Sequence, residues 1–187
     1  MILFIHGFAS CGLGQKSRLL IAHYGSERVL TPDLPFAPAQ AAAALQRLVD
    51  EHPIQLLVGS SLGGYYATWL NREHNIPAVL INPAVRPWEL LEGHLGPQRR
   101  WCDGVPFEFT PEHAAQLQAL YRPQLRPDER YLVLLQSGDE VLDYRAAATY
   151  YGDHDCLIEA GGNHRFENLA DYLPAIDTFR HGTLTAP

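Results

Sequence analysis

The 187-residue sequence has few cysteines, few charged residues and no long apolar run. Its three cysteines, Cys11, Cys102 and Cys156, are odd in number and widely spaced, so they predict neither a zinc knuckle nor a disulfide framework. Reduced thiols of this kind are typical of a cytoplasmic protein. No stretch approaches the roughly 18 apolar residues that a membrane-spanning helix needs, and the N-terminus lacks the basic region that begins a signal peptide. We therefore expect a cytoplasmic protein without a membrane span.

Basic residues are also scarce. Lysine and arginine together number 14 against 21 aspartates and glutamates, which gives a formal net charge of −7. An acidic chain is a poor candidate for binding nucleic acid or an anionic membrane. No Walker lysine follows the glycine-rich stretch GSSLGG, and this stretch does not match the dinucleotide fingerprint G-x-G-x-x-G. These absences favour a small-molecule partner, and nothing in the sequence indicates the oligomeric state.

Short apolar runs bounded by turn residues recur along the chain. Because they lack the alternation of a half-exposed strand, they fit strands that are buried on both faces of a parallel sheet. Helical patterns separate several of them, and this order predicts an α/β fold with a doubly wound, mainly parallel sheet of about six strands, in a single domain spanning residues 1–187. The expected strands are residues 2–5, 28–31, 54–58, 78–81, 131–136 and 156–159. The expected helices are residues 39–52, from the glycine-rich motif to Glu73, 144–151, and 167–179 with Pro174 as a candidate kink.

Residues 83–128 interrupt this alternation. The segment has many prolines, no strand pattern and one helix near residues 111–121, for which Thr110 is a suitable N-cap. We expect a helical insertion or cap, placed before the penultimate strand and lying over one end of the sheet. A mobile lid and a plain helical connection both remain open. The aromatic side chains of the segment either line an acyl pocket or fill a small core, and its arginines leave open a site for the phosphates of coenzyme A.

The stretch GSSLGG contains the pattern G-x-S-x-G between an apolar run and a helix. In a nucleophile elbow, the residues two before and two after the reactive serine must be small, because neighbouring backbone crowds them. Around Ser61 these positions are Gly59 and Gly63, whereas around Ser60 they are the bulky Val58 and Leu62. The spacing therefore selects Ser61 as the nucleophile.

A serine needs a general base, and the base needs an acid that orients it. In this arrangement the chain order is Ser, then Asp or Glu, then His, each after a strand. Asp139 is the first carboxylate after the run YLVLLQ, and His164 lies in the glycine-rich loop after the last expected strand. We expect His164 as the base and Asp139 as its acid, with Glu140 and Asp143 as the alternatives for the acid.

The first expected strand ends in His6-Gly7-Phe8, a loop of the H-G-x kind. Such a loop contributes a backbone N–H to the oxyanion hole, in which two donors stabilise the charge of the tetrahedral intermediate. The expected donors are the N–H groups of Phe8 and Leu62. We expect His6 to support the loop by hydrogen bonds rather than to react. A metal site formed by His6 and His164 lacks any ligand-spacing pattern, so we expect no metal. Acyl transfer to water by these residues also needs no organic cofactor, so we expect none.

Together these motifs resemble those of the α/β-hydrolase superfamily and, more narrowly, of the small YqiA-type esterases. The resemblance rests on FIHGF, TPDLP, GSSLGGYYATWL, INPA, SGDEVLDY and GGNHRFEN. It implies a compact hydrolase of carboxylic esters or acyl thioesters that forms an acyl-enzyme on Ser61, with Asp139 and His164 completing the triad. An acyltransferase on the same scaffold and a non-catalytic binding protein are the alternatives.

Overall fold

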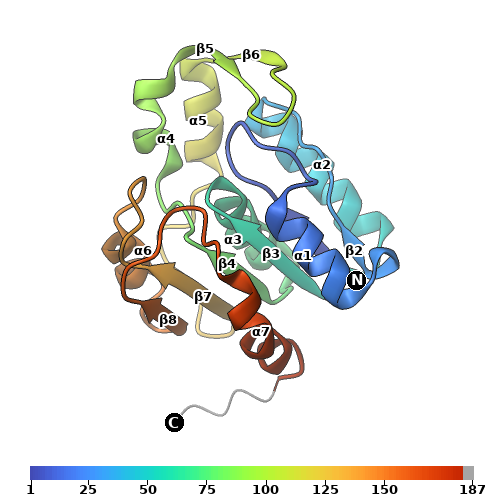
Figure 1. Ribbon diagram of the computed structural model, residues 1–187. Helices are drawn as coiled ribbons and strands as arrows, with labels where there is room; N and C mark the ends of the chain where they lie inside the picture. The colour runs from blue at the N-terminus through green and yellow to red at the C-terminus, as the bar shows by residue number, and fades with distance from the viewer. Residues whose placement is uncertain (183–187) are drawn as a thin grey trace.

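Six parallel strands form the central sheet of the computed structural model, which describes residues 1–182 (Figure 1). The strand order is β2-β1-β3-β4-β7-β8, so the chain first moves to one side of β1 and then to the other. This reversal makes the sheet doubly wound and creates a switch point between β1 and β3, where ligands bind in open α/β sheets. The strands are β1 (Ile2–Ile5), β2 (Val29–Leu30), β3 (Leu56–Ser60), β4 (Ala78–Ile81), β7 (Tyr131–Gln136) and β8 (Asp155–Glu159). The predicted six-stranded, mainly parallel sheet is confirmed.

Helices cover both faces of the sheet, and this explains why the central strands β1, β3, β4 and β7 are buried at every position. The edge strand β8 is largely exposed, so the expectation of burial on both faces is wrong for this strand. Leu3 and Ile5 of β1 pack in the core beneath α2 (Pro38–Glu51), α3 (Leu62–His74) and α6 (Tyr144–Tyr150). Ile2 and Phe4 belong to the other core, which also contains residues of α1 (Gln15–Tyr24) and α7 (Leu173–Arg180). These two helices lie on the same face of the sheet (Figure 1). Alternate residues of one strand thus enter two different cores. None of the helices within residues 1–182 is long and apolar enough to cross a membrane.

Two helical features differ from the expectations. The helix α1 is not among those that the apolar pattern predicts, because its buried residues include the polar Ser17 beside Leu20 and Tyr24. The last expected helix is divided into the short 3-10 helix η3 (Leu169–Tyr172) and α7, and Pro174 lies in the first turn of α7. A proline in the first turn breaks no helical hydrogen bond, so the expected kink is absent. A further 3-10 turn, η1 (Ser26–Arg28), leads into β2.

The segment of residues 83–128 contains α4 (Pro87–Leu90), the 3-10 helix η2 (Glu92–His94) and α5 (Pro111–Ala119). The side chain of Thr110 accepts a hydrogen bond from the His113 N–H at 3.3 Å, which confirms the expected N-cap of α5. The expectation that the segment has no strand is wrong. An antiparallel pair, β5 (Gly96–Arg99) and β6 (Pro106–Phe109), forms a hairpin. Each strand has four residues including a proline, too short for a recognisable alternation.

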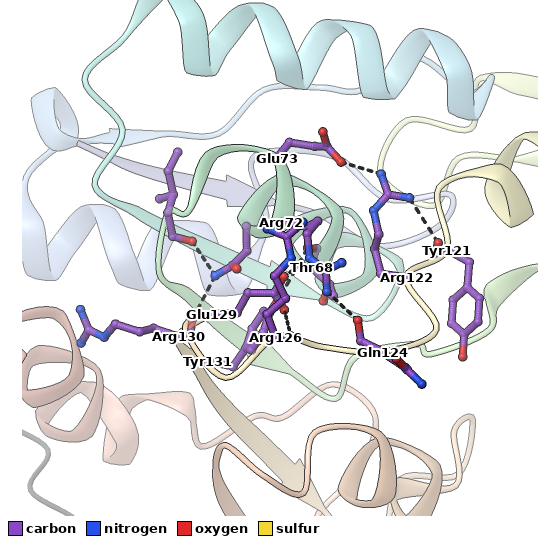
Figure 2. Close-up of polar contacts among 12 residues, drawn as sticks. Thr68, Arg72, Glu73, Tyr121, Arg122, Gln124, Arg126, Glu129, Arg130 and Tyr131 are labelled. Atoms are coloured by element: carbon purple, nitrogen blue, oxygen red, sulfur yellow. Dashed lines mark hydrogen bonds and ion pairs between the residues drawn. The ribbon is translucent and has the colours of Figure 1, made fainter.

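The C-terminal part of this segment is held against α3 by a polar network (Figure 2). The Arg72 guanidinium pairs with the carboxylate of Glu129, whose side chain is only 3% exposed. The other Glu129 oxygen accepts the Arg126 N–H at 3.0 Å. Next to it, Arg122 donates to Glu73 of α3 at 2.6 Å. Because a buried carboxylate is stable only when it is paired, this network fixes where the chain returns to the sheet.

Most aromatic side chains of the segment fill a core that is continuous with the core of the sheet. Phe109 is 2% exposed, and Trp88 packs edge-on against Tyr121 at a centroid distance of 4.9 Å. Phe107 and Phe109 also pack against Phe8 of the loop that follows β1, at 5.6 and 5.4 Å. Trp101 is the exception, since it is 85% exposed.

The cysteines contradict the expectation of three reduced thiols. Cys11, in the loop after β1, forms a disulfide with Cys102 in the hairpin connection, across a sequence separation of 91 residues. The nearby Trp101 N–H also donates to the Ala9 carbonyl at 2.8 Å. Sequence spacing carries no information on this proximity, because it arises only when the hairpin folds over the loop after β1. Cytoplasmic location, which rested on the thiols, stays a prediction.

Candidate active site

Ser61 occupies a sharp turn between β3 and α3. Its φ of 56° and ψ of −120° lie outside the regions that side chains favour. The surrounding structure holds this conformation, since the Ser61 N–H donates to the Ile81 carbonyl at 3.0 Å and its carbonyl accepts the Gly64 N–H at 2.9 Å. A strained residue between a strand and a helix is the geometry of a nucleophile elbow.

The flanking glycines have no room for a side chain. A Cβ atom on Gly59 would lie 2.3 Å from the Gly63 carbonyl oxygen, and one on Gly63 would lie 1.9 Å from the Ile5 carbonyl oxygen. Both distances are far below van der Waals contact. The crowding at Gly59 and Gly63 is the steric reason for the size rule by which the sequence favours Ser61 over Ser60.

The structure brings Ser61, Asp139 and His164 together from loops that follow β3, β7 and β8. The distance from His164 Nε2 to Ser61 Oγ is 3.1 Å, and the distance from His164 Nδ1 to Asp139 Oδ2 is 2.8 Å. The Asp139 side chain is 2% exposed and that of His164 is 21% exposed. One imidazole thus bridges a hydroxyl that water can reach and a carboxylate that it cannot, which is the arrangement of a Ser-His-Asp triad.

Among the three candidate acids, only Asp139 contacts the imidazole. Its second oxygen, Oδ1, accepts the N–H groups of Val141 and Leu142, each at 2.8 Å. Glu140, the next residue in the chain, accepts the backbone N–H of His164 at 3.0 Å. This hydrogen bond lowers the pKa of the Glu140 carboxyl. Asp143 caps α6 by accepting the Arg145 N–H at 3.0 Å.

The two expected oxyanion donors flank Ser61. Leu62 is the first residue of α3, and the first N–H groups of a helix have no partner inside the helix. The N–H of Phe8 forms no hydrogen bond within residues 1–182. The preceding Gly7 lies so near Ser61 that a Cβ on it would be 3.3 Å from the Ser61 Cβ. Phe8, Ser61 and Leu62 line the same cleft, and the role of the two N–H groups as oxyanion donors stays a prediction.

His6 joins the loops after β1 and β2. Its Nδ1 lies 2.8 Å from the Gly7 carbonyl oxygen, and its Nε2 accepts the Leu34 N–H at 3.1 Å. These partners require a neutral ring with the proton on Nδ1. Burial lowers the pKa of His6, although the Gly7 carbonyl and Asp33 partly oppose the shift. The supporting role expected from the sequence fits these contacts.

Two positioning residues were not predicted from the sequence. Asn82, directly after β4, donates to the Asn163 carbonyl at 3.1 Å, and Gln136, the last residue of β7, accepts the Asn163 N–H at 2.9 Å. Each is 2% exposed. Together they hold the loop that carries His164. A polar residue that ends an apolar strand is the signal that could have identified them.

A cleft of about 690 Å³ opens over Ser61 and His164. Its lining includes Leu90 and Leu91 from the segment of residues 83–128, together with the exposed Trp101. None of the arginines of that segment lines the cleft, and Arg86, Arg100 and Arg122 are paired with carboxylates. The structure thus places these arginines away from the position that a coenzyme A site at Ser61 needs.

One cluster of metal-ligand residue types is present within residues 1–182. It consists of Cys11, Cys102 and Asp103. The two sulfurs form a disulfide and so offer no thiolate, and the Asp103 carboxylate pairs with Arg100. His6 and His164, both near the cleft, have the other partners described above.

Comparisons with known proteins agree with this architecture. A model of an uncharacterised protein family (UPF0227) matches residues 1–181. The UPF0227 protein YcfP of Salmonella paratyphi A is 28% identical over 190 residues, and the match covers 96% of this chain and 98% of that protein. A putative hydrolase from Agrobacterium vitis S4 superimposes with a TM-score of 0.68 at 18% identity, covering 97% of this chain and 85% of that one. The α/β hydrolase domain-containing protein 10 from mouse gives 0.68 at 18% identity, covering 96% and 88%. The fold is therefore that of the α/β-hydrolases.

Proposed function

The chain belongs to the UPF0227 family, and from the geometry around Ser61 we propose that it is a serine hydrolase that cleaves carboxylic esters or acyl thioesters. The observation that carries the proposal is the alignment of His164 between Ser61 and the buried Asp139, at 3.1 and 2.8 Å, inside an open cleft. The hydrolases among the structural neighbours lend general support.

In the proposed reaction, His164 Nε2 accepts the proton of Ser61 as the Ser61 Oγ attacks the carbonyl carbon of the substrate. The negative charge that develops on the carbonyl oxygen is stabilised by the N–H groups of Phe8 and Leu62. The loss of one such donor typically lowers the rate by about 10²–10³-fold. The imidazolium then returns the proton to the leaving alcohol or thiol, and an acyl group remains on Ser61.

Water attacks this acyl-enzyme in the second half of the reaction. His164 accepts a proton from the water, and the serine leaves as its hydroxyl is restored. Throughout, Asp139 holds Nδ1 protonated and so keeps Nε2 free to accept a proton. The proposed cycle uses only groups of this chain, the substrate and one water molecule, and needs no cofactor.

The test is the hydrolysis of 4-nitrophenyl acetate and a matched thioester by the wild type and by Ser61→Ala. We expect the variant to lose about 10⁴-fold or more in kcat/KM without loss of thermal stability. Ser60→Ala is the matched control, since Ser60 lines the same cleft and is buried beside the nucleophile, but its side chain forms no hydrogen bond with His164 or Asp139 within residues 1–182. A fluorophosphonate should add its mass to Ser61 alone. Unchanged hydrolysis by Ser61→Ala, or labelling at another residue, contradicts the proposal.

A further inference from the structure

Two cationic side chains line the cleft that contains Ser61 and His164. One is Lys16, in the first turn of α1, and the other is Arg165, which directly follows His164. Lys16 is the only lysine among the 187 residues. The two cations come from opposite parts of the chain, and the fold brings them to the same cleft.

Neither cation has an ion-pair or hydrogen-bond partner for its side chain within residues 1–182. Lys16 is half-buried, and its pKa is lowered first by burial and then by the positive charge of Arg165. The positive charge of Arg165 disfavours the charged form of the Lys16 ammonium, and no carboxylate within residues 1–182 forms an ion pair with Lys16 to compensate. Arg165 is exposed, whereas Lys16 differs from the partly buried Arg72 and Arg100, which are both paired with carboxylates.

Glu140 is the carboxylate that lines the same cleft, and it does not neutralise this pair. Its Oε2 accepts the His164 N–H at 3.0 Å, and it forms no ion pair with Lys16 or Arg165 within the described part of the chain. The cleft is thus locally cationic at one place in a protein whose net charge is −7. A local field of this sign attracts an anion and orients it.

The remainder of the cleft is largely apolar, with Leu90, Leu91 and Val141 in its lining. The nucleophile therefore lies within one cleft that has both apolar and cationic lining. We propose that the preferred substrates are esters that carry a carboxylate or phosphate group, which Lys16 and Arg165 bind while Ser61 attacks the acyl carbon. This inference rests on the proposed hydrolase function and names its substrate class.

The first test compares matched pairs of esters that differ only in an anionic group. Three pairs distinguish a carboxylate from a phosphate, and an anion in the acyl group from an anion in the leaving group. The pairs are 4-nitrophenyl hydrogen adipate with its methyl ester, 4-nitrophenyl 6-phosphonooxyhexanoate with the 6-hydroxy compound, and the acetate of 5-hydroxy-2-nitrobenzoate with the acetate of its methyl ester. We expect at least one anionic ester to exceed its neutral partner about tenfold or more in kcat/KM, and added salt to reduce the ratio.

Variants assign this ratio to the two side chains. We expect Lys16→Gln and Arg165→Gln each to reduce the ratio of anionic to neutral kcat/KM about five- to tenfold. Arg18→Gln is the matched control, because Arg18 is an exposed cation of the same helix that does not line the cleft. Two results overturn the inference but not the hydrolase function. One is hydrolysis of the neutral esters without any preference for the anionic ones. The other is a ratio of anionic to neutral kcat/KM that Lys16→Gln and Arg165→Gln leave unchanged. The absence of all ester hydrolysis overturns the proposed function.

A second measurement is independent of turnover. Pyridoxal 5′-phosphate is an anionic aldehyde that forms an imine with an amine, and borohydride reduces the imine to a stable adduct. Pyridoxal, which lacks the phosphate, closes to an internal hemiacetal and reacts more slowly with any amine, so the N-terminal amine of the same protein is the reference. We expect the ratio of the two labelling rates, phosphate over pyridoxal, to be higher at Lys16 than at the N-terminal amine, and Arg165→Gln to lower it at Lys16. The peptide mass distinguishes the two amines. Equal ratios at the two amines in the wild type contradict an anion site.

Discussion

Asp139 and Glu140 are adjacent carboxylates, and only one of them is positioned to orient the base. We predict that Asp139→Asn lowers kcat/KM for 4-nitrophenyl acetate by about 10⁴-fold, or about 5.5 kcal/mol of transition-state stabilisation. The physical reason is the tautomer of His164. An asparagine can still accept the Val141 and Leu142 N–H groups through Oδ1, but its amide then points N–H groups at His164 Nδ1, 2.8 Å away in the wild type.

Two donors cannot face each other, so the imidazole places its proton on Nε2. In that state it donates to Ser61 Oγ and cannot accept the hydroxyl proton. Glu140→Gln has a different result. The amide oxygen of glutamine can still accept the His164 N–H, so we predict a loss of less than about tenfold.

The assay is steady-state release of 4-nitrophenolate by the wild type and both variants, with thermal unfolding to confirm that each variant is folded. Asp143→Asn is a matched control, because Asp143 caps α6 and has no contact with His164. It should retain activity. A larger loss in Glu140→Gln than in Asp139→Asn would transfer the orienting role to Glu140, and small losses in both would refute the triad.

Two further predictions concern stability. The Cys11–Cys102 disulfide closes a loop across a separation of 91 residues. Loop entropy therefore predicts that the double variant Cys11→Ser/Cys102→Ser loses about 4–5 kcal/mol in the free energy of unfolding. Urea denaturation measures this loss, and Cys156→Ser is the control. Alkylation in denaturant should find one free thiol before reduction and three after it, and three at the outset would contradict the disulfide. Because burial lowers the pKa of His6, the unfolded chain takes up a proton at a higher pH than the folded chain does. The stability that neutral His6 contributes is therefore complete above about pH 6.5, the ordinary value for histidine, and declines as the pH falls below it. In His6→Gln the slope of stability against pH in this range should be smaller by up to about 1.4 kcal/mol per pH unit, and an unchanged slope would refute the assignment.

Local patterns predicted most of the fold. The six apolar runs became the six strands of the sheet. For the central strands β1, β3, β4 and β7 the reason is burial on both faces, whereas the edge strand β8 is largely exposed and its apolar run reflects strand preference alone. The hairpin of β5 and β6 was missed for the opposite reason, since two short, proline-containing strands form only where they can pack against Phe8 and the loop after β1.

Part of the candidate site could likewise be predicted from the sequence, and part depends on the tertiary structure. Gly59, Ser61 and Gly63 could be identified from the sequence because the steric requirement of the elbow acts between neighbours in the chain. Asp139 and His164 could be placed because the carboxyl ends of parallel strands meet at one edge of the sheet. Asp139 differs from Glu140 because its Oδ2 lies 2.8 Å from His164 Nδ1. Two adjacent carboxylates cannot be told apart in this way from their positions in the sequence.

The sequence by itself predicted the six strands of the central sheet, most of the longer helices and Ser61 as the candidate nucleophile, because each of these predictions depends on short-range sterics or on the periodicity of burial. Only the tertiary structure decided that Cys11 meets Cys102, that Asn82 and Gln136 hold the His164 loop, and that Lys16 and Arg165 share the cleft. These contacts join residues that lie far apart in the chain. They exist only after the sheet has set the positions of its loops, and no local pattern carries information on them.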